Sequence, residues 1–72
     1  MEYILITLSR QGIDEDLKVP DFAPTGELLS AFCEIYGGKW KLLHAEPKGI
    51  ILDKSKTLAE QGIEHGARLT LS

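Results

Sequence analysis

The chain has 72 residues, of which 43% are hydrophobic and 26% are charged, and its formal net charge is −3. This length suits a single domain over residues 1–72 with one small core, and the composition excludes a disordered segment. One Cys excludes an internal disulfide, and one Cys with two His falls short of a four-ligand zinc site. We therefore expect no metal and no cofactor.

The sequence also indicates where the protein works. No run approaches the roughly 20 apolar residues of a membrane span, and the N-terminus lacks the features of a signal peptide. The expected location is the cytoplasm, without direct membrane insertion. Residues 1–38 carry seven acidic and two basic residues, whereas residues 39–72 carry six basic and four acidic ones. The basic half suits either an acidic partner or an ordinary solvated surface.

The first two elements are predicted to be strands joined by a hairpin. Tyr3 to Leu8 is rich in β-branched and large apolar residues, and alternation points Ile4, Ile6 and Leu8 inward. The Ser9 to Gly12 segment reads as the hairpin loop. In the second strand, Ile13 to Val19, Leu17 and Val19 point inward. Glu15 breaks this pattern, so we expect a frayed end or a bulge there.

The best helix candidate is the Pro20 to Tyr36 segment. Its apolar residues recur at spacings of three and four, which gives one apolar stripe: Leu28, Leu29, Phe32, Cys33, Ile35 and Tyr36. Pro24 suits the first turn, and either Thr25 or Asp21 is expected to cap it. The Gly37-Gly38 pair ends the helix.

The C-terminal half is predicted to hold three more strands. In the first, Lys39 to Ala45, we expect Trp40 and Leu42 to face inward, and Lys41 and Leu43 to face outward.

The remaining elements follow a turn. Glu46 to Gly49 forms that turn, and Ile50 to Leu52 is a short strand whose exposed edge could pair with a second copy. Thr57 to Gln61 reads as one helical turn before Gly62. Ala67 to Leu71 is the last strand, with Arg68 and Thr70 pointing outward.

This order, ββαββ followed by a short helix and a strand, is typical of an α+β β-grasp fold with one main helix on a mixed four- to five-stranded sheet. Three stretches resemble ubiquitin: the leading apolar strand, Asp16 to Pro20, and Lys56 to Leu71. Val19-Pro20-Asp21-Phe22-Ala23-Pro24 and the closing Gly62 to Leu71 segment more closely resemble the YukD/EsaB family. These are ubiquitin-like accessory proteins of bacterial type VII secretion systems.

The resemblance also implies two departures from ubiquitin itself. Ubiquitin and its sulfur-carrier relatives use an extended Gly-Gly tail, whereas this sequence ends at Leu71-Ser72. Thr70 and Ser72 are polar where the patch gripped by ubiquitin receptors needs apolar groups. We therefore expect neither conjugation nor an ordinary ubiquitin receptor.

The residues themselves indicate no catalytic site. His44 and His65 are isolated, and we read them as a half-buried strand residue and a turn residue. Cys33 lies in the helix stripe, where a small buried hydrophobic residue is expected instead of a reactive thiol. Asp14, Glu15 and Asp16 alternate across a strand and do not converge. Nucleic acid is not an expected partner, because Trp40 is better explained as a core residue.

We therefore predict a non-catalytic ubiquitin-like protein-interaction module, a cytosolic accessory or regulatory component of a type VII (WXG100/ESX-like) secretion system. Its partner would be a membrane or ATPase component, bound noncovalently. The predicted docking surface is the outward sheet face: Tyr3, Leu5, Lys41, Leu43, Arg68 and Thr70. Two alternatives stay open: a β-grasp regulatory subunit of a multicomponent monooxygenase, and a modifier or sulfur carrier lacking its Gly-Gly tail.

Overall fold

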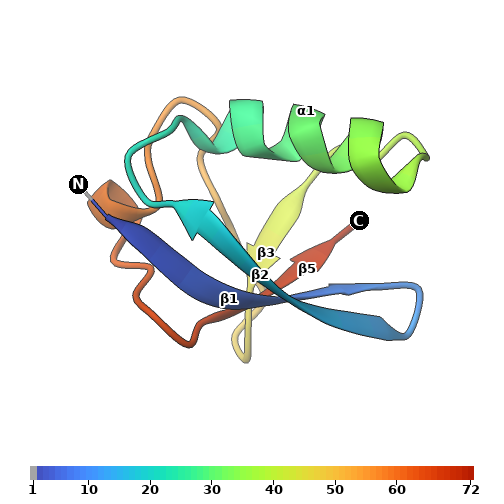
Figure 1. Ribbon diagram of the computed structural model, residues 1–72, viewed down its shortest axis with the longest axis horizontal. Coiled ribbons are helices and arrows are strands. Elements are labelled where there is room, and N and C mark those ends of the chain that lie inside the picture. Colours follow the sequence, from blue (N-terminus) through green and yellow to red (C-terminus); the bar gives the residue numbers. More distant parts are fainter. Residues whose placement is uncertain (1) are drawn as a thin grey trace.

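The computed structural model describes residues 2–72 and has the predicted order of elements. That order is β1 (Tyr3–Arg10), β2 (Ile13–Pro20), α1 (Thr25–Tyr36), β3 (Leu43–Ala45), β4 (Ile50–Ile51), the 3-10 helix η1 (Ala59–Gln61) and β5 (Arg68–Leu71). The strands form a five-stranded sheet in the order β2-β1-β5-β3-β4. β1 and β5 are parallel, and the other neighbours are antiparallel. α1 crosses one face of this mixed sheet (Figure 1), so the other face is left free of a helix.

The core lies between α1 and the sheet, as most of the apolar patterns predict, but the expectation that Ile35 belongs to the buried helix stripe is wrong, because this residue is 69% exposed. Ile4, Ile6 and Leu8 alternate inward from β1, and each is at most 4% exposed. They meet the helix residues Leu28, Leu29 and Phe32, together with buried side chains from β3, β5 and the loops. Burial of this apolar surface is the main force that holds the helix on the sheet.

The β1–β2 hairpin is continuous from Tyr3↔Pro20 to Arg10↔Ile13, so the bulge or frayed end expected at Glu15 is absent from this ladder. Glu15 points to the helix side of the sheet because it pairs with Leu8. Arg10 explains why a charged residue is tolerated on the helix side of the sheet. Its guanidinium donates to Glu15 at 2.9 Å and lies 3.8 Å from the centre of the Tyr36 ring. The ion pair joins β1 to β2, and the cation–π contact with Tyr36 fastens the hairpin to the end of α1.

The start of α1 differs from the expectation that Thr25 or Asp21 caps it. Pro24 is the capping residue and makes no side-chain cap hydrogen bond. Thr25 is already helical, and its fully buried hydroxyl donates to the Lys56 carbonyl at 2.7 Å. The Asp21 carboxylate accepts from the Glu2 N–H at 2.8 Å. Both candidate caps therefore connect the helix entry to other segments.

The predicted alternation in the third strand is wrong by one residue. β3 begins only at Leu43, and the N–H groups of Lys41 and Leu42 both donate to the Ser72 carbonyl. Two consecutive residues thus face one, as in a β-bulge, and the side-chain alternation shifts. Leu43 pairs with Leu71 and points into the core, where it is 2% exposed, whereas Leu42 is half-buried.

Candidate functional site

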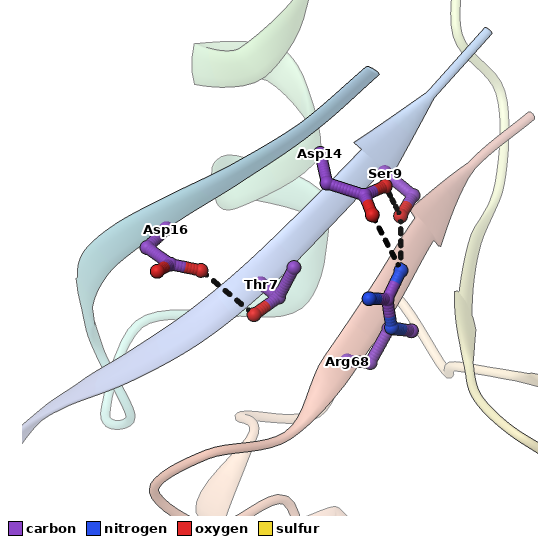
Figure 2. A network of polar contacts seen from close by, with 5 residues as sticks. All are labelled: Thr7, Ser9, Asp14, Asp16 and Arg68. Atoms are coloured by element: carbon purple, nitrogen blue, oxygen red, sulfur yellow. Dashed lines mark hydrogen bonds and ion pairs between the residues drawn. The ribbon is translucent and has the colours of Figure 1, made fainter. Parts of the chain in front are cut away.

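The face of the sheet opposite α1 is crossed by a polar network (Figure 2). Thr7 on β1 donates to Asp16 on β2 at 2.8 Å. Arg68 on β5 donates to Ser9 at 2.9 Å and forms an ion pair with Asp14 at 3.1 Å, and Ser9 also donates to Asp14. These pairs span three neighbouring strands, so the centre of this outer face is engaged in contacts within the protein.

Asp14 in this network and three acids elsewhere in the protein have lowered pKa values. Hydrogen bonds from Ser9 and then Arg68 hold the pKa of Asp14 below its ordinary value of 3.8. Hydrogen bonds with Arg10 and then Tyr36 hold the pKa of Glu15 below 4.5. Asp53, in the loop after β4, and Glu60, within η1, also have lowered pKa values, because Ser55 donates hydrogen bonds to Asp53 and Thr57 donates to Glu60. In each case the folded state favours the carboxylate over the acid.

These shifts predict that acid weakens the fold. Since the folded pKa values are lowered, their stabilisation is complete above the ordinary values of 3.8 for Asp and 4.5 for Glu, and is lost as the pH falls below them and through the folded values. Urea unfolding at a series of pH values should show a falling free energy of unfolding over that window. Arg68→Gln should flatten the dependence, because it removes a cause of the Asp14 shift. A free energy that stays level or rises on acidification contradicts this assignment.

The structure separates the residues of the predicted docking surface. Tyr3 and Leu5 point outward from β1 and are 59% and 41% exposed. Arg68 and Thr70 share that face, but Arg68 is paired with Asp14, and Thr70 lies opposite His44. The other two predicted residues lie before and within β3. Lys41 is exposed but precedes the strand, and the expectation that Leu43 faces outward is wrong because it lies in the core.

Phe22, which the sequence analysis did not select, joins Tyr3. It follows β2, is 40% exposed, and packs edge-to-face on Tyr3 with 5.5 Å between ring centroids. Phe22 lies within the Val19 to Pro24 segment that carries the family resemblance, so the sequence could have pointed to it. The position of Phe22 beside Tyr3, however, depends on the register of the β1–β2 hairpin. We call Tyr3, Leu5 and Phe22 the aromatic corner. It is an uncovered apolar group beside the polar network.

A pocket of about 370 Å³ adjoins the aromatic corner. Its walls come from the start of β1, the residue after β2 and the segment from η1 to the turn before β5. Four of its lining residues are ionisable: Glu2, Asp21, Glu64 and His65. His65 connects pocket and corner directly, because its Nδ1 accepts from the Leu5 N–H at 3.1 Å. We call this feature the acidic pocket.

The described His and Cys side chains lie apart and make hydrogen bonds within the fold. The His44 Nε2 is hydrogen-bonded to the Ser72 hydroxyl, far along the sheet from the His65 that contacts Leu5. Cys33 is half-buried, and its thiol donates to the Trp40 carbonyl at 3.5 Å. Within residues 2–72, no three His, Cys, Asp or Glu side chains are grouped closely enough to hold a metal ion.

The same part of the chain contains no helix long and apolar enough to cross a membrane.

Comparison with solved structures identifies the architecture. The chain is similar to the EccD5 ubiquitin-like domain of Mycobacterium xenopi, with a TM-score of 0.85 and 15% identity over 100% of this chain and 94% of that one. It is also similar to the ubiquitin of Caldiarchaeum subterraneum, with a TM-score of 0.78 and 20% identity over 97% and 91% of the two chains.

A third similar chain belongs to protomer 1 of the ESX-3 core complex. It has a TM-score of 0.78 and 22% identity over 99% of this chain, but this chain spans only 16% of that one. No protein-family model and no curated protein matches the sequence. The similar structures confirm the ubiquitin-like β-grasp fold.

Proposed function

We propose that this chain, which has a ubiquitin-like β-grasp fold, is a non-catalytic module that binds a protein partner noncovalently through its outer sheet face. The observation that carries the proposal is the aromatic corner. Tyr3, Leu5 and Phe22 are all at least 40% exposed and lie beside one another. Exposed apolar side chains gathered with aromatic rings, next to a polar rim, are typical of interfaces with other proteins.

The polar groups around the corner fit the rim of such an interface. Arg68 retains 51% exposure of its side chain while it is paired with Asp14. Thr70, level with Ser9, and the exposed Lys41, whose N–H donates to the Ser72 carbonyl, lie farther along the sheet from the corner. Rim groups of this kind contribute to orientation and association rate more than to affinity. Leu43 has no part in this surface.

We place the module in a type VII secretion system as an accessory or regulatory component of bacterial cytoplasm. Support comes from the Val19 to Pro24 segment, which resembles the YukD/EsaB family, and from the similarity to the EccD5 ubiquitin-like domain and to a chain of the ESX-3 core complex. The partner would be a membrane or ATPase component of that apparatus.

Leu5→Asp tests the docking surface. We expect it to abolish capture of the partner, because a carboxylate at the centre of the corner must be desolvated on binding. The fold should tolerate the change, since Lys18 lies directly opposite position 5 and can pair with the new acid. Pull-down with purified candidate subunits measures the binding, and circular dichroism checks the fold.

The matched control is Ile35→Asp. Ile35 is 69% exposed on the opposite side of the molecule, on α1, so the same chemical change there should leave capture intact. Equal capture by the wild type and Leu5→Asp would reject the aromatic corner as the docking surface.

A further inference from the structure

We infer that the aromatic corner and the acidic pocket together bind a partner segment in which a Lys or Arg side chain adjoins a large apolar one. This inference rests on the proposed function and specifies the chemistry of the partner. It would place the apolar side chain on Tyr3, Leu5 and Phe22, and the cationic group in the adjoining pocket.

The two features adjoin at the edge of β1, where His65, which lines the pocket, accepts from the Leu5 N–H at 3.1 Å. Alternation along β1 points Ile4 to the pocket side of the strand, and Tyr3 and Leu5 to the outer face. Glu2 and Ile4 line the pocket, whereas Tyr3 and Leu5 belong to the corner. Asp21 lines the pocket, and its neighbour Phe22 packs on Tyr3. Reciprocal hydrogen bonds of 2.8 Å join Glu2 and Asp21: the Glu2 N–H donates to the Asp21 carboxylate, and the Asp21 N–H donates to the Glu2 carbonyl. The boundary between corner and pocket is therefore fixed by the backbone.

Charge complementarity selects the occupant. Glu2, Asp21 and Glu64 contribute three carboxylates, and no Lys or Arg is among the residues that line the pocket in the described chain. Such a one-signed lining attracts cations and repels phosphate groups, so it disfavours a nucleic acid or an anionic lipid surface.

The position of Lys18 determines on which side of Leu5 the cationic group of the partner would lie. Lys18 lies across from Leu5 on β2, whereas His65 contacts Leu5 from the other side. A cationic group would be repelled on the β2 side and attracted on the pocket side. The apolar corner extends beyond the pocket, so a small free cation would leave it uncovered. A protein segment that presents both groups covers both features.

The first experiment uses model peptides. An isotope-labelled sample of the whole chain is titrated with three capped peptides, Gly-Trp-Arg-Leu-Arg-Gly, the same peptide with Glu for Arg, and the same peptide with Gln for Arg. The Arg peptide should move the amide signals of Glu2, Leu5, Phe22 and His65 in a saturable way, and added salt should weaken it. Equal or stronger shifts with the Glu or Gln peptide, or no shifts at these residues, overturn the inference.

Charge reversal supplies the second readout. The double variant Glu2→Lys with Glu64→Lys should weaken binding of the Arg peptide about tenfold or more, since two attractive pairs become repulsive. Both side chains can be changed without loss of a described hydrogen bond, because Glu2 and Glu64 use main-chain atoms in theirs. The matched control is Glu34→Lys, on the exposed side of α1, which should leave binding unchanged.

The same variants separate this inference from the proposed function. If the partner is lost in Leu5→Asp and retained in the double charge reversal, the cationic segment is wrong and the docking surface stands. If both variants retain the partner, the proposed docking surface fails as well. Concentration-dependent shifts of the corner in the protein alone would identify a second copy as the occupant and overturn the inference.

Discussion

Replacing Leu43 with Asp is expected to unfold the protein. The side chain is 2% exposed and packs between α1 and β5, in the centre of the core. Truncation of a buried Leu alone costs about 2–5 kcal/mol, and an unpaired carboxylate adds several more. A chain of 72 residues has a total stability of roughly 4–11 kcal/mol. The expected loss is therefore comparable with the whole stability.

The measurement is thermal unfolding followed by circular dichroism, with Leu5→Asp as the matched variant. The same substitution at Leu5 falls on the outer face and should keep a cooperative transition near that of the wild type. A cooperative, wild-type-like transition for Leu43→Asp would show that β3 has the opposite alternation. In that case, Leu43 would return to the outer face.

Thr25→Val is expected to lower the free energy of unfolding by about 1–3 kcal/mol, which corresponds to a melting temperature lower by roughly 4–8 °C per kcal/mol. Valine has nearly the same shape but no hydroxyl. The fully buried Thr25 hydroxyl donates to the Lys56 carbonyl and accepts from Gln61 Nε2 at 3.0 Å. Both of those groups would lose one partner in a part-buried setting, while the Lys56 carbonyl keeps the Thr25 N–H.

Gln61 extends the hydrogen bonds of Thr25 into a network that also includes Asp53 and Thr57. Its Nε2 also lies within hydrogen-bond distance of the Asp53 and Thr57 carbonyls, and its Oε1 accepts from the Asp53 N–H at 2.6 Å. Gln61→Ala should therefore destabilise the protein, and Thr25→Val combined with Gln61→Ala should cost less than the two single changes added. Ser30→Ala, on the exposed side of α1, is the control with little effect. Strict additivity would contradict a shared network.

The elements that the sequence predicts best are those with a repeating apolar pattern. Leu28, Leu29 and Phe32 mark one face of a helix, and Ile4 and Ile6 alternate with exposed neighbours. These local patterns are enough to predict α1, the β1–β2 hairpin and the order of the remaining strands along the chain. The same alternation explains why Tyr3 and Leu5 were predicted to point outward.

The register of β3 was not predictable in this way. Trp40, Leu42 and Leu43 are all apolar, so their pattern fits either alternation. The choice depends on the Ser72 carbonyl, which accepts from two consecutive N–H groups far away in the sequence. Glu15 is a similar case. Its place on the helix side follows from the pairing with Leu8 and is compensated by Arg10.

Only the part of the candidate site that depends on local strand alternation was predicted from the sequence. The exposure of Tyr3 and Leu5 follows from strand alternation, which is local. Phe22 reaches Tyr3 through the hairpin register, and His65 reaches the Leu5 N–H across 60 positions of sequence. The acidic pocket likewise needs three separate segments to meet. Such groupings depend on the tertiary fold, and a linear pattern does not contain them.

Affinity capture from the cells that naturally make the protein tests noncovalent docking most directly. The tagged protein is captured once and eluted under native and under denaturing conditions, and the bound species are identified by mass. We predict partners in the native eluate only, among them a secretion ATPase or membrane subunit, and their loss from the Leu5→Asp sample. A species that survives denaturation at the combined mass of this protein and a target would contradict noncovalent binding.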